Sequence, residues 1–180
     1  MWGDWRDAYV HGTLVIWPPD DVRAVVNLLR ERYDPTSARI CEAHITLTQP
    51  LVSAPDNDAI TVIEQITASI TPIEILFGGV GTFLPYSCLY LIVEPDAPIT
   101  ALREALQRSS LFRAVPSHHE RYVPHMTILE GNLPADTVAQ LAYDLRDETP
   151  AGSFICDEVA YIVPDASFRF SVRRRFSLSR

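Results

Sequence analysis

HITL at residues 44–47 and HMTI at residues 125–128 are two copies of one short pattern, a histidine and a threonine two positions apart with apolar residues interleaved. Side chains alternate between the two faces of a β-strand, so each copy can present an imidazole and a hydroxyl together on one face. Two imidazoles across a cleft form an acid–base pair, and two hydroxyls can donate hydrogen bonds to phosphate oxygens. The repeated pattern therefore indicates phosphodiester chemistry without a metal.

Each copy has the same place in a repeated order of elements, namely strand, helix, motif strand, helix and strand. The histidines lie 125 − 44 = 81 positions apart, and the helices that follow them begin 134 − 57 = 77 positions apart. A duplicated unit with an approximate twofold axis explains these offsets and brings the two motif strands side by side. The expected segments are strands at 11–17, 73–83, 89–93, 153–163 and 168–178, extended motif segments at 39–49 and around 125, and helices at about 20–33, 56–70, 98–109 and 134–146, with Asp20 or Asp21 and Asp56 as helix caps.

Length and composition indicate one globular domain. The chain has 180 residues, of which 47% are hydrophobic and 21% charged, and no linker rich in Gly, Ser or Pro divides it. We expect a single domain of two pseudo-symmetric lobes, at about residues 1–85 and 86–180, joined near Pro85-Tyr86-Ser87. No apolar run approaches the ~20 residues that span a bilayer, and the N-terminus lacks the layout of a signal peptide, so a cytoplasmic protein without membrane contact is expected.

The charge balance restricts the ligands. The formal net charge of −8 argues against a general binder of nucleic acid, and in particular of an extended duplex, because clustered positive charge provides most of that affinity. One small or terminal phosphate group is compatible with it. All 15 basic residues are arginine. Those near the C-terminus either decorate a solvated strand or flank the cleft and orient an anion: Arg169, Arg173, Arg174, Arg175 and Arg180.

No metal or cofactor site is expected. The three cysteines are widely separated and each lies in an apolar run, which is typical of buried free thiols. His118-His119-Glu120 is interpreted as part of a polar loop rather than as a ligand cluster, because adjacent side chains point apart and no third ligand is evident. Thr48 would share the face of Thr46, but Leu129 occupies the matching position after the second motif, so a structural role is expected for Thr48.

With these motifs in view, the sequence resembles the two-histidine (2H) phosphoesterase superfamily, and within it the branch of 2′-5′ RNA ligases and RNA 2′,3′-cyclic phosphodiesterases. The resemblance extends from HGTLVIW through AHITLTQPL, GVGTF and LYLIVEP to YVPHMTILEG. It implies a duplicated, bilobed α+β fold in which antiparallel sheets form a central cleft and helices lie outside.

The resemblance also implies the roles of the motif residues. His44 would be the proton donor and His125 the proton acceptor, although the symmetry of the motifs leaves that order open from the sequence alone. Thr46 and Thr127 would bind the phosphate. The implied partner is a nucleotide or RNA end that bears a cyclic phosphate, acted on by a monomer, and the reverse reaction would be 2′-5′ ligation.

Three further residues are candidates for substrate binding. Phe83 and Tyr86 are aromatic residues near strand ends that could stack on a base, although core packing or loop anchoring is the alternative for each. Arg121 precedes the second motif by four residues and could reach a phosphate, or could be a solvated loop arginine. A non-catalytic nucleotide-binding or phosphate-binding protein of the same fold is the alternative function, and the acidic Glu130 after the second motif is its support.

Overall fold

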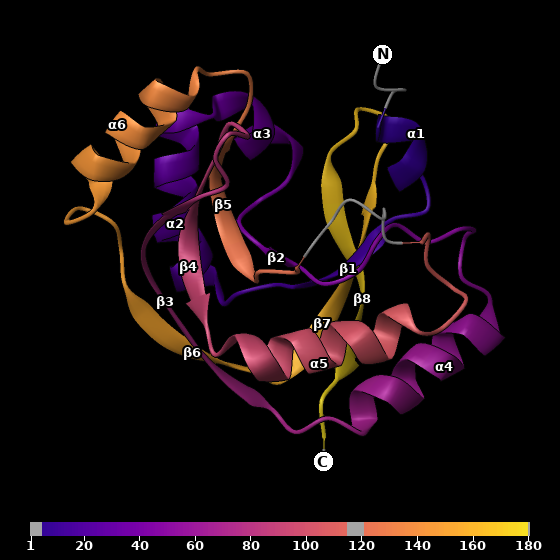
Figure 1. Ribbon diagram of the computed structural model, residues 1–180. Coiled ribbons are helices and arrows are strands. Elements are labelled where there is room, and N and C mark those ends of the chain that lie inside the picture. The colour runs from indigo at the N-terminus through magenta and orange to yellow at the C-terminus, as the bar shows by residue number, and fades with distance from the viewer. Residues whose placement is uncertain (1–4, 115–120, 180) are drawn as a thin grey trace.

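The computed structural model describes residues 5–114 and 121–179, whose strands form two antiparallel four-stranded sheets (Figure 1). The strand order is β2-β1-β7-β8 in the first sheet and β5-β4-β3-β6 in the second. The strands are β1 (Thr13–Ile16), β2 (Ile45–Thr46), β3 (Ile73–Thr82), β4 (Cys88–Glu94), β5 (His125–Glu130), β6 (Gly152–Cys156), β7 (Glu158–Pro164) and β8 (Phe170–Ser177). The expected α+β fold with antiparallel sheets is confirmed.

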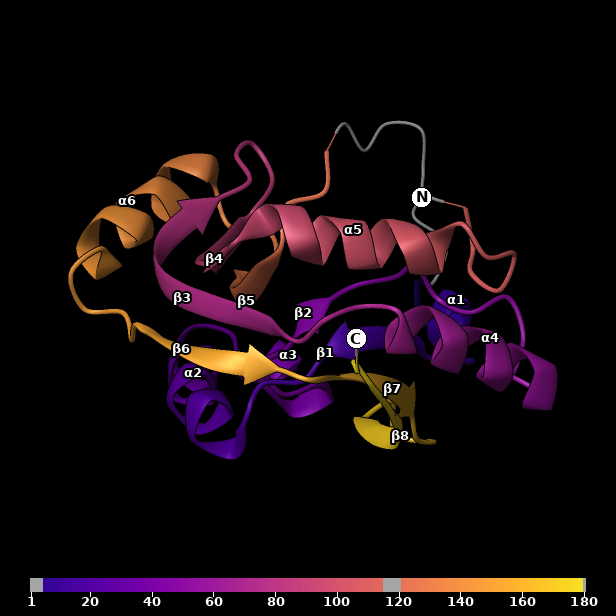
Figure 2. The ribbon, with the colours of Figure 1, turned by 90° about the horizontal axis from the view of Figure 1, so that it is seen from below.

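The helices pack around these sheets. Within the described residues they are α1 (Trp5–Tyr9), α2 (Asp20–Tyr33), α3 (Pro35–Ile40), α4 (Asn57–Ala68), α5 (Asp96–Gln107) and α6 (Ala135–Leu145). Helix α2 contacts β5 and helix α6 contacts β3 and β4, so both pack on the second sheet, whereas α4 packs on β8 of the first. Figure 2 shows α5 running beside α4. None of the described helices is both long enough and apolar enough to cross a bilayer.

Two local expectations around the first motif are wrong. The segment 39–49 is not extended throughout, because α3 occupies residues 35–40: Pro35 starts the helix, and the side chain of Asp34 accepts a hydrogen bond from the Ser37 amide. Helix α2 is preceded by Pro19 and has no side-chain cap, since Asp20 is already its first residue. The cap expected at Asp56 is present, with the Ala59 amide donating to its carboxylate at 2.9 Å.

Strand β2 is short because a side chain ends its ladder with β1. The amides of Leu47 and Thr48 both donate to the carbonyl of Leu14. The Leu14 amide in turn donates to the hydroxyl of Thr48 at 3.1 Å, and that hydroxyl also lies 3.1 Å from the hydroxyl of Thr13. Thr48 is buried, so the structural role expected for it is confirmed.

The two duplicated units exchange one strand, which is the third strand of each sheet counted from the edge that carries the motif. The first unit contains β1, β2 and β3, yet β3 pairs with β4 of the second unit. In return β7, from the second half of the chain, pairs with β1. The junction expected near residues 85–86 therefore lies in the hairpin that joins β3 to β4 within one sheet, and the two sheets do not correspond to residues 1–85 and 86–180.

The strand expected at 153–163 is two strands in different sheets. β6 pairs with β3 in the second sheet, and after Asp157 the chain continues as β7 between β1 and β8 of the first sheet. A strand between two neighbours can be covered on both faces, and accordingly residues 159–162 are all buried. The continuous apolar run in the sequence hides this change of sheet.

One hydrophobic core extends through both sheets and contains the interleaved apolar residues of the two motifs: Ile45, Leu47, Met126 and Ile128. The histidine and threonine of each motif are only partly buried and lie on the opposite face, as the alternation predicts. Strands β2 and β5 are both sheet edges, and they lie against each other. The fold thus brings the two motifs together at the line where the sheets meet.

Candidate functional site

The two motif histidines are oriented by the same local contact. His44 Nδ1 lies 2.7 Å from the carbonyl of Glu42, and His125 Nδ1 lies 2.7 Å from the carbonyl of Val123, in each case two residues back. A carbonyl only accepts hydrogen bonds, so Nδ1 carries the proton and donates. In each neutral ring this leaves Nε2 unprotonated and available for proton transfer.

The electrostatics of the site favour neutral imidazoles. Burial lowers the pKa of His44 to about 4, and the positive charges of Arg30 and of a protonated His125 act in the same direction, while the hydrogen bond to Glu42 opposes them. Burial also lowers the pKa of His125. Because a positive charge on His125 lowers the pKa of His44, the protonation of one histidine disfavours that of the other.

The threonine hydroxyls are available to a ligand. The backbone carbonyls of Thr46 and Thr127 are both engaged, but neither side-chain hydroxyl has a hydrogen bond within residues 5–114 and 121–179. Both side chains are partly exposed on the face that carries the histidines. A hydroxyl donates one hydrogen bond, so the two threonines can contact two oxygens of one phosphate.

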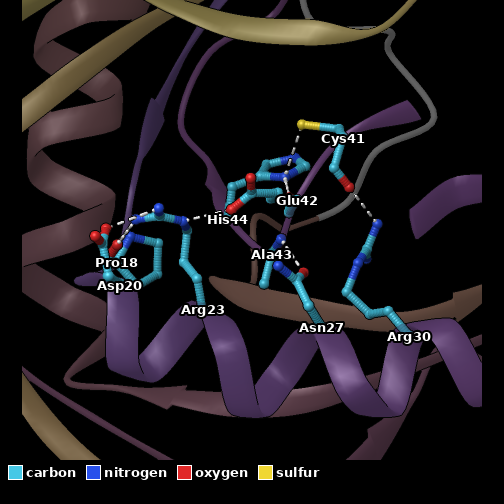
Figure 3. A network of polar contacts seen from close by, with 9 residues as sticks. All are labelled: Pro18, Asp20, Arg23, Asn27, Arg30, Cys41, Glu42, Ala43 and His44. Carbon is cyan, nitrogen blue, oxygen red and sulfur yellow. Dashed lines mark hydrogen bonds and ion pairs between the residues drawn. The ribbon is translucent and has the colours of Figure 1, made fainter. Parts of the chain in front are cut away.

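Helix α2 holds the segment that leads to His44. Three of its polar side chains follow one face, and each binds a different one of residues 41–43 (Figure 3). Arg23 Nε donates to the Glu42 carboxylate at 2.7 Å, and the Ala43 amide donates to Asn27 Oδ1 at 2.8 Å. Arg30 Nη2 donates to the Cys41 carbonyl at 2.9 Å. The spacing of four and three residues aligns these side chains on the helix.

Arg30 also reaches the second motif, because its Nη1 donates to the Thr127 carbonyl at 2.5 Å. Arg30 as a whole is 3% exposed, no carboxylate lies within ion-pair distance of it among the described residues, and burial lowers its pKa. A matching contact runs the other way, since Arg103 of α5 donates to the Leu47 carbonyl. Tyr122 adds a hydrogen bond from its hydroxyl to the Thr46 carbonyl at 2.8 Å. Each half of the chain thus fixes the motif of the other.

Aromatic rings surround His125. Phe83 meets the imidazole edge-on with ring centroids 5.0 Å apart, and Tyr90 lies 5.1 Å from it. The Tyr90 ring covers Gly81, where a Cβ atom would come within 2.4 Å of the ring, so only glycine fits there. His44 has one such neighbour among the described residues, Trp17, whose ring is nearly parallel at 6.4 Å.

The other candidates from the sequence make no hydrogen bond or ring contact with the histidines among the described residues. Tyr86 is 70% exposed in the β3–β4 hairpin and makes no ring contact among the described residues. The exposed side chain of Arg121 forms an ion pair with Asp96. In the C-terminal strand Arg174 pairs with Glu64 and Arg175 pairs with Glu158, as expected for a solvated strand. His118, His119 and Glu120 lie outside the described residues.

Sequence reasoning missed Arg30, Arg103 and Tyr90. Arg30 continues the buried stripe of α2 at four-residue spacing from Val22 and Val26, and a charge at a core position of an amphipathic helix was the available signal. Tyr90 pairs with Thr127 across the ladder, which the sequence cannot indicate before the strand partners are known. The described residues contain no group of three or more His, Cys, Asp or Glu side chains arranged to hold a metal ion, and all three cysteines are buried and free.

Comparison with known proteins assigns this architecture. A family model described as the 2′-5′ RNA ligase superfamily matches residues 18–167. The chain belongs to this superfamily. The two-histidine phosphoesterase resemblance is thereby confirmed, and the family supports phosphoesterase or RNA ligase-type activity in general. A Geobacillus kaustophilus (strain HTA426) protein named "Putative phosphoesterase GK0864" is 36% identical over 136 residues, which cover 71% of this chain and 75% of that protein.

Solved structures of other proteins share the fold. E. coli LigT solved with 3′-AMP has a TM-score of 0.61 and 15% identity, covering 93% of this chain and 97% of LigT. LigT solved with NADP+ also has a TM-score of 0.61, with 16% identity and coverage of 96% and 99%. TT0787 of Thermus thermophilus has a TM-score of 0.57 and 16% identity, covering 92% of this chain and 96% of that protein.

Proposed function

We propose that this superfamily member is a phosphodiesterase that opens the 2′,3′-cyclic phosphate of a nucleotide or RNA end, with no metal ion needed for the chemistry. The observation that carries the proposal is the matched setting of the two imidazoles, each with Nδ1 bonded to a backbone carbonyl and Nε2 left for proton transfer. The two threonine hydroxyls beside them make no hydrogen bond in the described part of the chain and suit the oxygens of one phosphate. The LigT structures with 3′-AMP and NADP+ support a nucleotide as the ligand.

In the proposed reaction, neutral His125 accepts a proton from water through Nε2 while the water oxygen bonds to phosphorus. The bond from phosphorus to one ribose oxygen breaks, and protonated His44 gives its proton to that oxygen. Thr46 and Thr127 donate to the non-bridging oxygens as negative charge develops there. One water is consumed, and the product carries one free ribose hydroxyl and one phosphomonoester.

The lowered pKa values add a condition to this mechanism. Both imidazoles are neutral at pH 7 in the free protein, so the donor must gain its proton when the substrate binds. The phosphate provides the reason, because a nearby negative charge raises the pKa of an imidazole. Binding of a phosphate ligand should therefore take up a proton, which calorimetry in buffers of different ionisation enthalpy would measure.

With a 5′-hydroxyl in the place of water, the same proton transfers would join a 2′,3′-cyclic end to a second strand. His125 would accept the proton of the attacking hydroxyl and His44 would protonate the ribose 3′-oxygen that leaves phosphorus, without any requirement for ATP. Hydrolysis is favoured in dilute aqueous solution, because water is the more abundant nucleophile. We therefore propose hydrolysis as the main reaction and 2′-5′ ligation as its counterpart.

The test is hydrolysis of a panel of 2′,3′-cyclic nucleotides by the purified protein, with the double variant His44→Ala/His125→Ala as the inactive control. We expect turnover that is unchanged by a chelator. Activity that a chelator abolishes and a divalent ion restores would overturn the metal-free mechanism. Tight binding of the cyclic nucleotides without turnover would instead identify a non-catalytic nucleotide-binding protein.

A further inference from the structure

The catalytic face of the first sheet is closed. Val15 pairs with Thr46 and with Ala160, so these residues share the face that carries His44. Val15 is 0% exposed, Ala160 1% and Ile162 1%, and the three pack in a small hydrophobic cluster with Trp17 and Phe170. This face offers no room for an organic group next to the phosphate.

The catalytic face of the second sheet is open. Ile92 pairs with His125 and Tyr90 pairs with Thr127, so this face carries the second motif. Here Leu76 is 51% exposed and Ile92 is 40% exposed, although both are apolar. The strand opposite Ile92 contains Gly79, which adds no side chain above the sheet. The contrast in exposure identifies the second sheet as the side on which a ligand has space.

A groove of about 1120 Å³ follows this open face. It begins beside His125, where Pro124, Tyr90 and Ile92 line it, and it continues over Leu76 to the first turn of α5. Its volume slightly exceeds the range that is usual for small-molecule sites, so it is large enough for a nucleoside. Its apolar floor suits a flat, uncharged organic group.

The rim of the groove is acidic. Glu74 and Glu94 both line it, both are exposed, and neither has an ion-pair partner within residues 5–114 and 121–179. They lie on the same face as Leu76, since Glu94 pairs with Leu76 and Glu74 is two residues along the strand. Asp96 also lines the groove, but its charge is balanced by Arg121. The two unpaired carboxylates would repel any phosphate beyond the one at the histidines.

We propose that this groove is the nucleoside subsite, and that it selects a nucleoside body whose 5′ position carries a hydroxyl rather than a phosphate. The inference rests on the proposed function, in which the cyclic phosphate lies between His44 and His125. Because the first sheet is closed, the nucleoside must lie on the second sheet. The acidic rim then favours a hydroxyl over a phosphate at the 5′ position of that nucleoside. Cyclic mononucleotides with a free 5′-hydroxyl are the substrate class that fits.

The test compares adenosine 2′,3′-cyclic phosphate with its 5′-phosphorylated form in wild-type protein, in Glu74→Gln/Glu94→Gln and in Glu31→Gln, which alters an exposed carboxylate on α2. At low salt we expect kcat/KM to favour the 5′-hydroxyl form by about tenfold in wild type. The preference should fall close to parity in the double variant and remain in the Glu31→Gln control. Calorimetric binding of adenosine 3′-monophosphate and adenosine 3′,5′-bisphosphate gives the same comparison without turnover.

The outcomes separate the two proposals. A binding preference that the double variant removes, without turnover of either cyclic phosphate, would refute the phosphodiesterase and retain the groove. Turnover without a preference for the 5′-hydroxyl form, or with a preference that the double variant keeps, would refute the proposed role of the groove and retain the phosphodiesterase. The role of the groove would also be refuted if neither adenosine phosphate bound. A dimer that Leu76→Ser abolished would refute it too, because the face would then bind a second copy of the chain.

Discussion

The two motif strands present the same residues by different means. Strand β2 has only two residues, and the segment leading to His44 is held by side chains of α2. Strand β5 has six residues, and His125 begins its backbone ladder with β4, opposite Ile92. The hydrogen bond of each Nδ1 is nevertheless the same. An imidazole can therefore be oriented equally well by a polar network or by a backbone ladder, but only the network can be dismantled by changing one side chain.

The largest effect should come from replacing the histidines themselves. The loss should be similar for His44, which the α2 network holds, and for His125, which the β5 ladder holds. His44→Ala and His125→Ala should each lower kcat by about 10²- to 10⁴-fold, because each removes one partner in proton transfer. The double variant should be little worse than the poorer single variant, since two groups that act as a unit are not additive. Steady-state kinetics over pH would check this, and near-normal turnover of either single variant would contradict the paired mechanism.

The threonines should show a smaller and again symmetrical loss. Thr46→Val and Thr127→Val keep the side-chain shape and remove one hydrogen bond to the developing charge on phosphate, which should cost about 2–3 kcal/mol in the activation free energy. The loss should appear mainly in kcat. Unequal losses would indicate that one threonine binds the phosphate and the other only completes a strand. Thr61→Val, an exposed threonine of α4, is a matched control.

Arg30 should be the most sensitive support, because it serves both motifs. Arg30→Met removes the hydrogen bonds that Arg30 donates to the carbonyls of Cys41 and Thr127, which should lower the free energy of unfolding by about 2 kcal/mol even after the buried charge is removed. We expect about a tenfold loss in kcat and a smaller change in KM. Denaturant unfolding and kinetics measure the two effects, and Arg32→Met, on the exposed side of α2, is the control. Unchanged kcat would show that β5 needs no such support.

The last prediction concerns how the free energy of unfolding changes with pH. His44 has a pKa of about 4 when folded and about 6.5 when unfolded, so between these values the unfolded chain binds a proton that the folded chain does not. The free energy of unfolding should therefore decrease as pH falls through this window, by at most about 1.4 kcal/mol per pH unit from this residue. His44→Gln should flatten that slope. Chemical unfolding at several pH values would detect it, and a slope unchanged by the substitution would contradict the shift.

The two motifs could be recognised from the sequence because their chemistry depends on residues that are close together in the chain. Alternation alone puts His44 beside Thr46, and repetition separates a site from a chance pattern. The exchange of third strands was not accessible, since β3 fits either sheet by its own residues and only long-range pairing decides. The same holds for Arg30 and Tyr90, whose positions depend on which helix and strand lie next to the motif. The shortness of β2 depends on one hydroxyl, that of Thr48, replacing a backbone partner.

The exchange of third strands also sets an order for folding during synthesis. The second sheet consists of β3, β4, β5 and β6, so all of its strands exist once residue 156 has left the ribosome. The first sheet must wait for β7, because β1 pairs with it between Thr13 and Ile162, which are 162 − 13 = 149 positions apart. The strand that carries His125 can thus be in place while β2, which directly follows His44, still lacks most of its sheet. In a nascent chain, the complete setting of both histidines can therefore form only after the last strands have been synthesised.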